Sequence, residues 1–362
     1  MIVSIQYLRG IAALMVVLSH VAWKGHQYLD DPMGWFRIGN GGVDLFFVIS
    51  GFIMCHTTAR SRGTVRDASM FMAHRFARIL PLYWVLTLAT LAVFLAMPSR
   101  INTSGGRTDI WQSFLLVPTD GKYLIQAGWT LSYEFFFYFL FAAAMLLGRR
   151  WAHPIVAAAL VLLVAAGQEW PPHSVGALFA TDALLVEFAY GIALYHLVSA
   201  KLTGRLTGIL SIIAGLVGFA LVNADLFHPK LRCFRLGVPA LLVCYGVVCF
   251  EQDLRRHAVE RLKALGDSSY SLYLMHPFPL AAAAPVLAVA LHHAFAPVFV
   301  LALVLCSTVC GWLVYLWIEA RLTRLSKPWV ERLVLALSRG RGTDPFPPAR
   351  LPADAGTASG TR

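Results

Sequence analysis

Residues 7–20 read YLRGIAALMVVLSH, an apolar run that contains one arginine and one histidine. The run lies in the first stretch of the chain that is able to cross a bilayer core, for which a helix needs about 20 residues. Arg9 and His20 are eleven positions apart, so on a helix they share a face and lie roughly 16 Å apart along the axis. Because burying an arginine in lipid costs on the order of 2.5–3.5 kcal/mol, the pair predicts a functional site.

The composition of the whole chain is that of a multi-pass membrane protein. Its 362 residues are 58% hydrophobic and 14% charged, with a formal net charge of +11, whereas soluble domains are about half apolar. The excess of basic over acidic residues does not predict a nucleic-acid partner, because lysine and arginine are enriched in the cytoplasmic loops of membrane proteins. The six cysteines include no Cys-x-x-Cys pair, so we predict neither a disulfide framework nor a metal site.

Ten apolar segments are candidate spans, although 153–168 and 236–250 are shorter than a bilayer requires. With the N-terminus inside, most of the 30 lysines and arginines fall in cytoplasmic segments, as the positive-inside rule demands. We therefore expect an all-α polytopic membrane helix bundle of about ten transmembrane helices, with cytoplasmic N- and C-termini. The expected domains are a membrane-embedded domain over 1–320 and a cytoplasmic tail over 321–362, with an interfacial helix followed by disorder. The segments are 2–22, 43–59, 79–97, 129–148, 153–168, 177–198, 205–222, 236–250, 269–291 and 295–319.

Three titratable residues are expected near the outer membrane face. His20 lies near the outer end of the first span, and Asp44 and Glu134 lie near the starts of spans that begin outside. An imidazole beside a carboxylate is a common general base, since the carboxylate fixes the tautomer and stabilises the imidazolium. The alternative is a structural ion pair near the headgroups. The long outside loop over 98–128 is expected to dip into the interface or to cap the bundle.

Other polar residues are expected deeper in the membrane or at its inner side. Arg75 and Arg78 are three positions apart, so they can grip a phosphate pair, or they serve as a topology signal or lipid-headgroup contact. Pro81 indicates a helix start there. His276 falls near mid-membrane, where Pro277 frees a backbone carbonyl; a pore-lining role and a packing hydrogen bond remain open. We expect structural pairing for the remaining intramembrane acids, Asp182, Glu187 and Glu319.

These residues occur in motifs that resemble the acyltransferase-3 family of integral membrane O-acyltransferases, of the kind that acetylate exopolysaccharide and O-antigen. The likeness covers about residues 4–320, and the motifs match in order. They are Arg9 with His20, the GVDLFFVISGF run over 42–52, Arg75-x-x-Arg78 with Pro81, the WTLS-x-E run over 129–134 with Phe137-Tyr138, and the SYSLYL-x-H run over 269–276.

The resemblance implies an enzyme of the bacterial inner membrane that takes an acyl group, expected to be acetyl, from cytoplasmic acyl-CoA. The acceptor would be a hydroxyl of a cell-surface saccharide, with no permanently bound cofactor and with polysaccharide-biosynthesis proteins as further partners. His20 would act as the base, oriented by Glu134 or Asp44, with an acyl-histidine intermediate as a variant. Arg9 would hold donor phosphate or the developing oxyanion. The donor-binding set would be Arg75, Arg78, Ser271 and His276.

Two rival functions use the same features. A saccharide transporter or flippase also has intramembrane charges. It predicts two related halves, whereas most of the motifs here crowd into residues 4–138. A non-catalytic subunit of a polysaccharide export complex needs no acyl-CoA.

Overall fold

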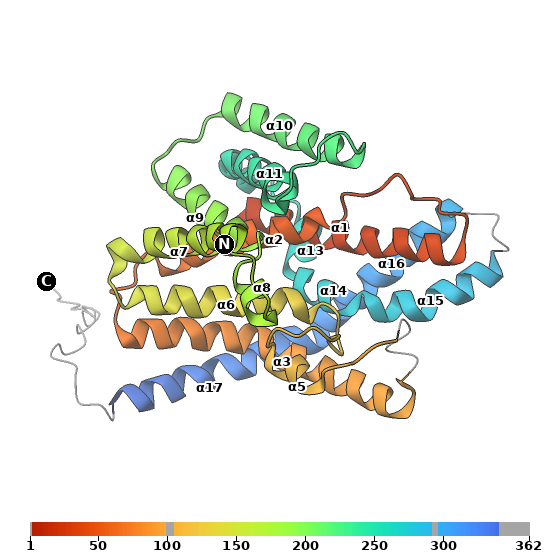
Figure 1. Ribbon diagram of the computed structural model, residues 1–362, viewed down its shortest axis with the longest axis horizontal. Helices are drawn as coiled ribbons and strands as arrows, with labels where there is room; N and C mark the ends of the chain where they lie inside the picture. Colours follow the sequence, from red (N-terminus) through yellow and green to blue (C-terminus); the bar gives the residue numbers. More distant parts are fainter. Residues whose placement is uncertain (1, 99–104, 292–295, 340–362) are drawn as a thin grey trace, which may run out of the picture.

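The computed structural model describes residues 2–98, 105–291 and 296–339, and over these ranges the protein is a bundle of helices without strands (Figure 1). The all-α prediction is confirmed. The helices are α1 (Val3–Tyr28), α2 (Gly41–Thr58), α3 (Val65–Ala96), α5 (Ile110–Leu115), α6 (Gly128–Met145), α7 (Arg149–Glu169), α8 (Val175–Ala180), α9 (Leu185–Ser199), α10 (Arg205–Asn223), η1 (Cys233–Gly237), α11 (Val238–Cys249), α12 (Glu251–Arg256), α13 (Glu260–Asp267), α14 (Ser269–Met275), α15 (Pro277–Ala290), α16 (Ala296–Val314), η2 (Tyr315–Glu319) and α17 (Ala320–Arg339).

All ten predicted segments contain helix in the structure, but 177–198 is interrupted between Ala180 and Leu185, 269–291 is broken between Met275 and Pro277, and residue 295 lies outside the described residues. Among the described residues, seven helices are long and apolar enough to cross a membrane, and α14 with α15 makes an eighth span if this pair, bent by 55°, is counted as one. The short segment at 153–168 grows into a span of 20 residues over Arg150–Glu169, whereas Cys233–Cys249 stays short. The protein is therefore a multi-pass membrane protein, and the count of ten remains a prediction.

Helix α3 begins earlier than the sequence predicted, and Pro81 lies inside it. Thr64 and Asp67 form a capping box that starts the helix at Val65, which is a strong N-terminal signal. Proline removes one backbone donor and leaves the carbonyl four residues earlier without its helical partner. That carbonyl, on Ala77, accepts a hydrogen bond from Ser326 of α17 at 2.9 Å. The prediction of a helix start at Pro81 is wrong because α17 compensates the proline.

Helix α17 lies along α3 at the lower edge of the bundle, on the side opposite α10 and α11 (Figure 1). His74 on α3 and Glu331 on α17 approach to 2.7 Å. The segment expected to form an interfacial helix in the tail is thus part of α17 and packs against the bundle. Residues 340–362, where disorder was expected, lie outside the described residues.

Helix α2 approaches α9 closely, and this packing places the residues that α2 contributes to the interior. A Cβ on Gly51 would collide with the carbonyl oxygen of Phe188, and a Cβ on Gly191 would collide with that of Val48. The Phe188 ring stacks on Phe47 at 4.6 Å between centroids. Because only glycine permits this approach of backbones, substitution at Gly51 would push the two helices apart.

The long loop before α6 folds back onto the middle of α3. Tyr83 donates a hydrogen bond to the carbonyl of Ser113 at 2.6 Å, and the indole of Trp84 donates to that of Phe114 at 3.0 Å. The described part of the loop therefore packs against α3, and the interfacial dip and the cap both stay predictions.

Candidate active site

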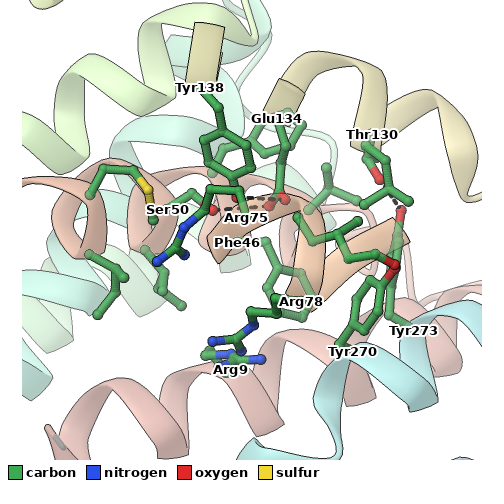
Figure 2. Close-up of a pocket in the computed structure, with 17 residues that line it drawn as sticks. Arg9, Phe46, Ser50, Arg75, Arg78, Thr130, Glu134, Tyr138, Tyr270 and Tyr273 are labelled. Carbon is green, nitrogen blue, oxygen red and sulfur yellow. Dashed lines mark hydrogen bonds between the residues drawn. The ribbon is translucent and has the colours of Figure 1, made fainter. Parts of the chain in front are cut away.

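Helices α1, α2, α3, α6 and α14 enclose a cavity of about 100 Å³ in the interior of the bundle (Figure 2). Its wall is apolar on the α2 side apart from Ser50, and the other elements contribute charged and hydroxyl groups. The polar lining residues are Arg9, Ser50, Arg75, Arg78, Thr130, Glu134, Tyr138, Tyr270 and Tyr273.

Three arginines converge on this cavity from two helices. Arg9 comes from α1, and Arg75 and Arg78 come from one side of α3, as their spacing of three predicts. In Figure 2, Arg78 approaches Arg9 from above, and their like charges lie close enough to interact. Within the described ranges, none of the three forms an ion pair with a carboxylate. The Arg75 Nε atom is buried without a hydrogen-bond partner there.

Three arginines at one cavity are chemically suited to an anion. Guanidinium groups bind phosphate oxygens through paired charge-assisted hydrogen bonds. Buried like charges without counterions are costly, and a bound polyanion would remove that cost. The structure therefore brings Arg75 and Arg78, expected from sequence to bind the donor, to one cavity with Arg9, which was expected to hold donor phosphate or the developing oxyanion.

Glu134 lies in the same cavity and not beside His20. Its Oε1 accepts a hydrogen bond from Ser50 of α2 at 3.0 Å, and its Oε2 accepts one from Tyr138 at 2.9 Å. Tyr138 follows Glu134 by four positions and so falls on the same helix face. Both carboxylate oxygens of Glu134 thus accept a hydrogen bond. The group also faces the arginines, and its negative charge partly offsets their positive charge. The expected contact between Glu134 and His20 does not form, because depth in the membrane does not determine which face of α6 turns towards α1.

Asp44 is also separate from His20. Its buried carboxylate accepts hydrogen bonds from Arg232, with Nη2 to Oδ2 at 2.7 Å and Nε to Oδ1 at 3.3 Å. Glu187 is a further electrostatic neighbour of both groups. The structure therefore favours the alternative reading of Asp44, a structural ion pair, and corrects the expectation that it orients His20. Arg232 was not singled out from the sequence, since it lies in the short segment before α11 and carries no motif.

His20 pairs instead with His276. The two ring centroids are 4.7 Å apart and the ring planes are inclined at 65°. The Nδ1 atom of His20 donates to the carbonyl of Val16 at 3.0 Å. His276 in turn lies against Tyr273, with 6.1 Å between the ring centroids. Tyr273 lines the arginine cavity and its hydroxyl is 2.7 Å from that of Thr130, so the histidine pair adjoins the cavity through this ring.

Ser271 does not line the cavity. Its hydroxyl donates to the Glu319 carboxylate on η2, and both side chains are buried. The structure thus gives Ser271 a structural contact between α14 and η2, and gives Glu319 the pairing that was expected of it.

Several cavity residues were visible in the quoted motifs without an assigned role. Ser50 stands in the run over 42–52, and Thr130 and Tyr138 stand beside Glu134. Only the spacing between Glu134 and Tyr138 signalled a contact, since residues four apart on a helix are neighbours. The Ser50 contact joins two helices, and the sequence contains no signal for it.

Comparison with known proteins now identifies the family. The profile of the acyltransferase-3 family, described as an acyltransferase domain, matches residues 2–317. The chain is 32% identical over 340 residues to the "Exopolysaccharide production protein ExoZ" of Rhizobium meliloti (strain 1021), covering 91% of this chain and all of that protein. It is 27% identical over 299 residues to the "Putative membrane-bound transacylase BcsY" of Komagataeibacter xylinus, covering 75% of this chain and 71% of the relative.

A shorter match joins it to "Nodulation protein 10" of Rhizobium leguminosarum bv. viciae, at 30% identity over 188 residues and a little under half of each chain. No solved structure matches the chain. The family profile runs from α1 into η2 and includes every residue of the cavity. The chain therefore belongs to the acyltransferase-3 family and is a membrane acyltransferase that transfers groups other than aminoacyl groups.

Proposed function

We propose that this protein is an inner-membrane O-acyltransferase that moves an acetyl group from acetyl-CoA to a hydroxyl of an exopolysaccharide or another cell-surface glycan. The arginine cavity is the observation that carries this proposal. Arg9, Arg75 and Arg78 line one cavity without forming an ion pair within the described chain, and the donor contains a pyrophosphate that suits them. The relatives named for exopolysaccharide production and transacylation support the choice of acceptor and reaction.

The distance between the two ends of the site fits the donor. Arg9 and His20 are separated by eleven residues of the continuous helix α1, which is roughly 16 Å of helical rise. The pantetheine arm of coenzyme A has a comparable extended length. With its phosphates at the arginines, the thioester would pass Phe46 and Tyr273 and reach the histidine pair.

The chemistry follows from the position of His20. Its Nδ1 hydrogen is held by the Val16 carbonyl, so Nε2 carries the lone pair in the neutral ring. Nε2 would accept the proton of the acceptor hydroxyl while that oxygen attacks the thioester carbonyl. The proton then leaves with the coenzyme A thiolate, and the ester bond replaces the thioester bond.

Membranes that contain the protein, incubated with labelled acetyl-CoA and de-O-acylated polysaccharide from the same cells, test the proposal. His20→Ala should keep the protein inserted and reduce acetyl transfer by about 100-fold or more, the usual contribution of a general base. Normal transfer by His20→Ala would refute the assignment of the base.

The donor site has its own test and a matched control. Arg75→Ala removes a charge-assisted contact to phosphate and should raise the KM for acetyl-CoA by about 10- to 100-fold. Arg37→Ala removes an arginine that does not line the cavity and whose exposed ion pair with Asp225 spans 3.4 Å, and it should leave that KM unchanged. An unaltered donor KM in Arg75→Ala would remove the arginine cavity from donor binding.

A further inference from the structure

The two histidines of the pair are held in the same tautomer by backbone carbonyls. Nδ1 of His20 donates to the carbonyl of Val16 at 3.0 Å, and Nδ1 of His276 donates to the carbonyl of Tyr273 at 2.8 Å. A carbonyl oxygen only accepts, so in each neutral ring the proton is on Nδ1. Each Nε2 therefore presents a lone pair and has no hydrogen to give.

Proline explains why the Tyr273 carbonyl is available to His276. Pro277 has no backbone N–H, so the carbonyl four residues earlier loses its helical partner. That carbonyl belongs to Tyr273, and the helix bends by 55° between α14 and α15 at this point. The imidazole takes the vacated place, and the ring orientation of His276 is fixed as a result.

The Nε2 atom of His276 is left without a partner. It is buried, and no group in the described ranges 2–98, 105–291 and 296–339 donates a hydrogen bond to it. Neutral His20, 4.7 Å away between ring centroids, has its only N–H committed to Val16. Leaving a buried acceptor unpaired is unfavourable, which indicates that a donor from outside the described chain fills the position.

The surroundings restrict the chemistry of that donor. Neither histidine forms an ion pair with a carboxylate within the described residues, because Asp44 is paired with Arg232 and Glu134 with Ser50 and Tyr138. An ammonium group would lack a counterion here. Two imidazole acceptors on rings whose centroids are 4.7 Å apart instead suit two neutral hydroxyl groups on adjacent carbons.

We propose that His276 binds the acceptor: its Nε2 accepts a hydrogen bond from the hydroxyl next to the one that His20 deprotonates. The inference rests on the proposed function and names its acceptor as a sugar residue with two neighbouring hydroxyls, of which one is acylated and the other stays free. His276 thereby fixes which hydroxyl faces the thioester.

Acceptor kinetics test the role of His276, with full-length protein in membranes, labelled acetyl-CoA and de-O-acylated polysaccharide from the same cells. His276→Phe keeps a ring against His20 but removes the lone pair, so it should raise the acceptor KM about tenfold, the effect of one lost hydrogen bond. His276→Gln places an amide oxygen near the former Nε2 and should restore part of the affinity. The donor KM should stay unchanged in both variants.

The product provides a second measurement that needs no variant. NMR of polysaccharide acetylated by the wild-type protein should find the new ester beside a carbon with a free hydroxyl. An ester without such a neighbour would overturn the inference, as would an unchanged acceptor KM in correctly folded His276→Phe. If His20→Ala also transfers normally, the assignment of the base fails; if membranes with the wild-type protein transfer no acetyl group to the polysaccharide, the proposed function itself fails. If only His276→Phe behaves as wild type, this inference fails alone.

Discussion

Replacing Arg232 by methionine should destabilise the protein strongly, because it leaves Asp44 buried and unpaired. The side chain of Asp44 is 0% exposed and that of Arg232 27% exposed, with 2.7 Å between Nη2 and Oδ2. Removing one partner of a buried ion pair costs about 3–5 kcal/mol. We expect a large fall in melting temperature in detergent, followed by the fluorescence of the ten tryptophans.

A second substitution separates the structural role of Asp44 from a catalytic one. Asp44→Asn combined with Arg232→Met removes both charges, so it should recover a substantial part of the lost stability and retain acetyl transfer. Arg37→Met, which breaks an exposed pair, is the control and should change stability by about 0–1 kcal/mol. If Asp44 orients His20 instead, Asp44→Asn alone would lower kcat by about 100-fold in a fully stable protein. That result would refute the structural assignment of Asp44.

Three further predictions test the helix breaks and the loop. Pro277→Ala restores a backbone donor that competes with His276 for the Tyr273 carbonyl. The His276 ring would lose its fixed orientation, so the acceptor KM should rise, whereas Pro285→Ala in the same helix should leave it unchanged. Ser326→Ala leaves the carbonyl of Ala77 in α3 without its donor, and a melting curve should show about 1 kcal/mol lost. Hydrogen bonds from a threonine and an arginine hold the pKa of Asp109 below its usual value. A carboxyl group whose pKa is lower in the folded than in the unfolded protein stabilises the fold at a pH above the unfolded pKa, and this stabilisation is lost as the pH falls through the folded pKa. Acid should therefore expose the loop to protease. Equal protection of the loop at pH 2 and pH 7 would contradict this.

Much of the fold could be read from the chain alone. Apolar runs of bilayer length predict helices without reference to their neighbours, because a helix satisfies its own backbone in lipid. Arg75 and Arg78 were expected on one side of a helix from their spacing, and the structure places both at one cavity. The start of α3 was missed because the donor that satisfies the carbonyl freed by Pro81 comes from α17, some 250 residues away.

The sequence by itself determined that the protein is a helical membrane bundle, that Arg9 and His20 share a helix face, and that its motifs are those of an acyltransferase. Which side chains contact one another was decided only by the tertiary structure. It paired Asp44 with Arg232, turned Glu134 towards the arginines, and placed His276 against His20. Spacing fixes which side chains share a face of one helix, whereas the rotation of each helix about its axis depends on packing between helices far apart in sequence, such as the close contact of Gly51 with α9.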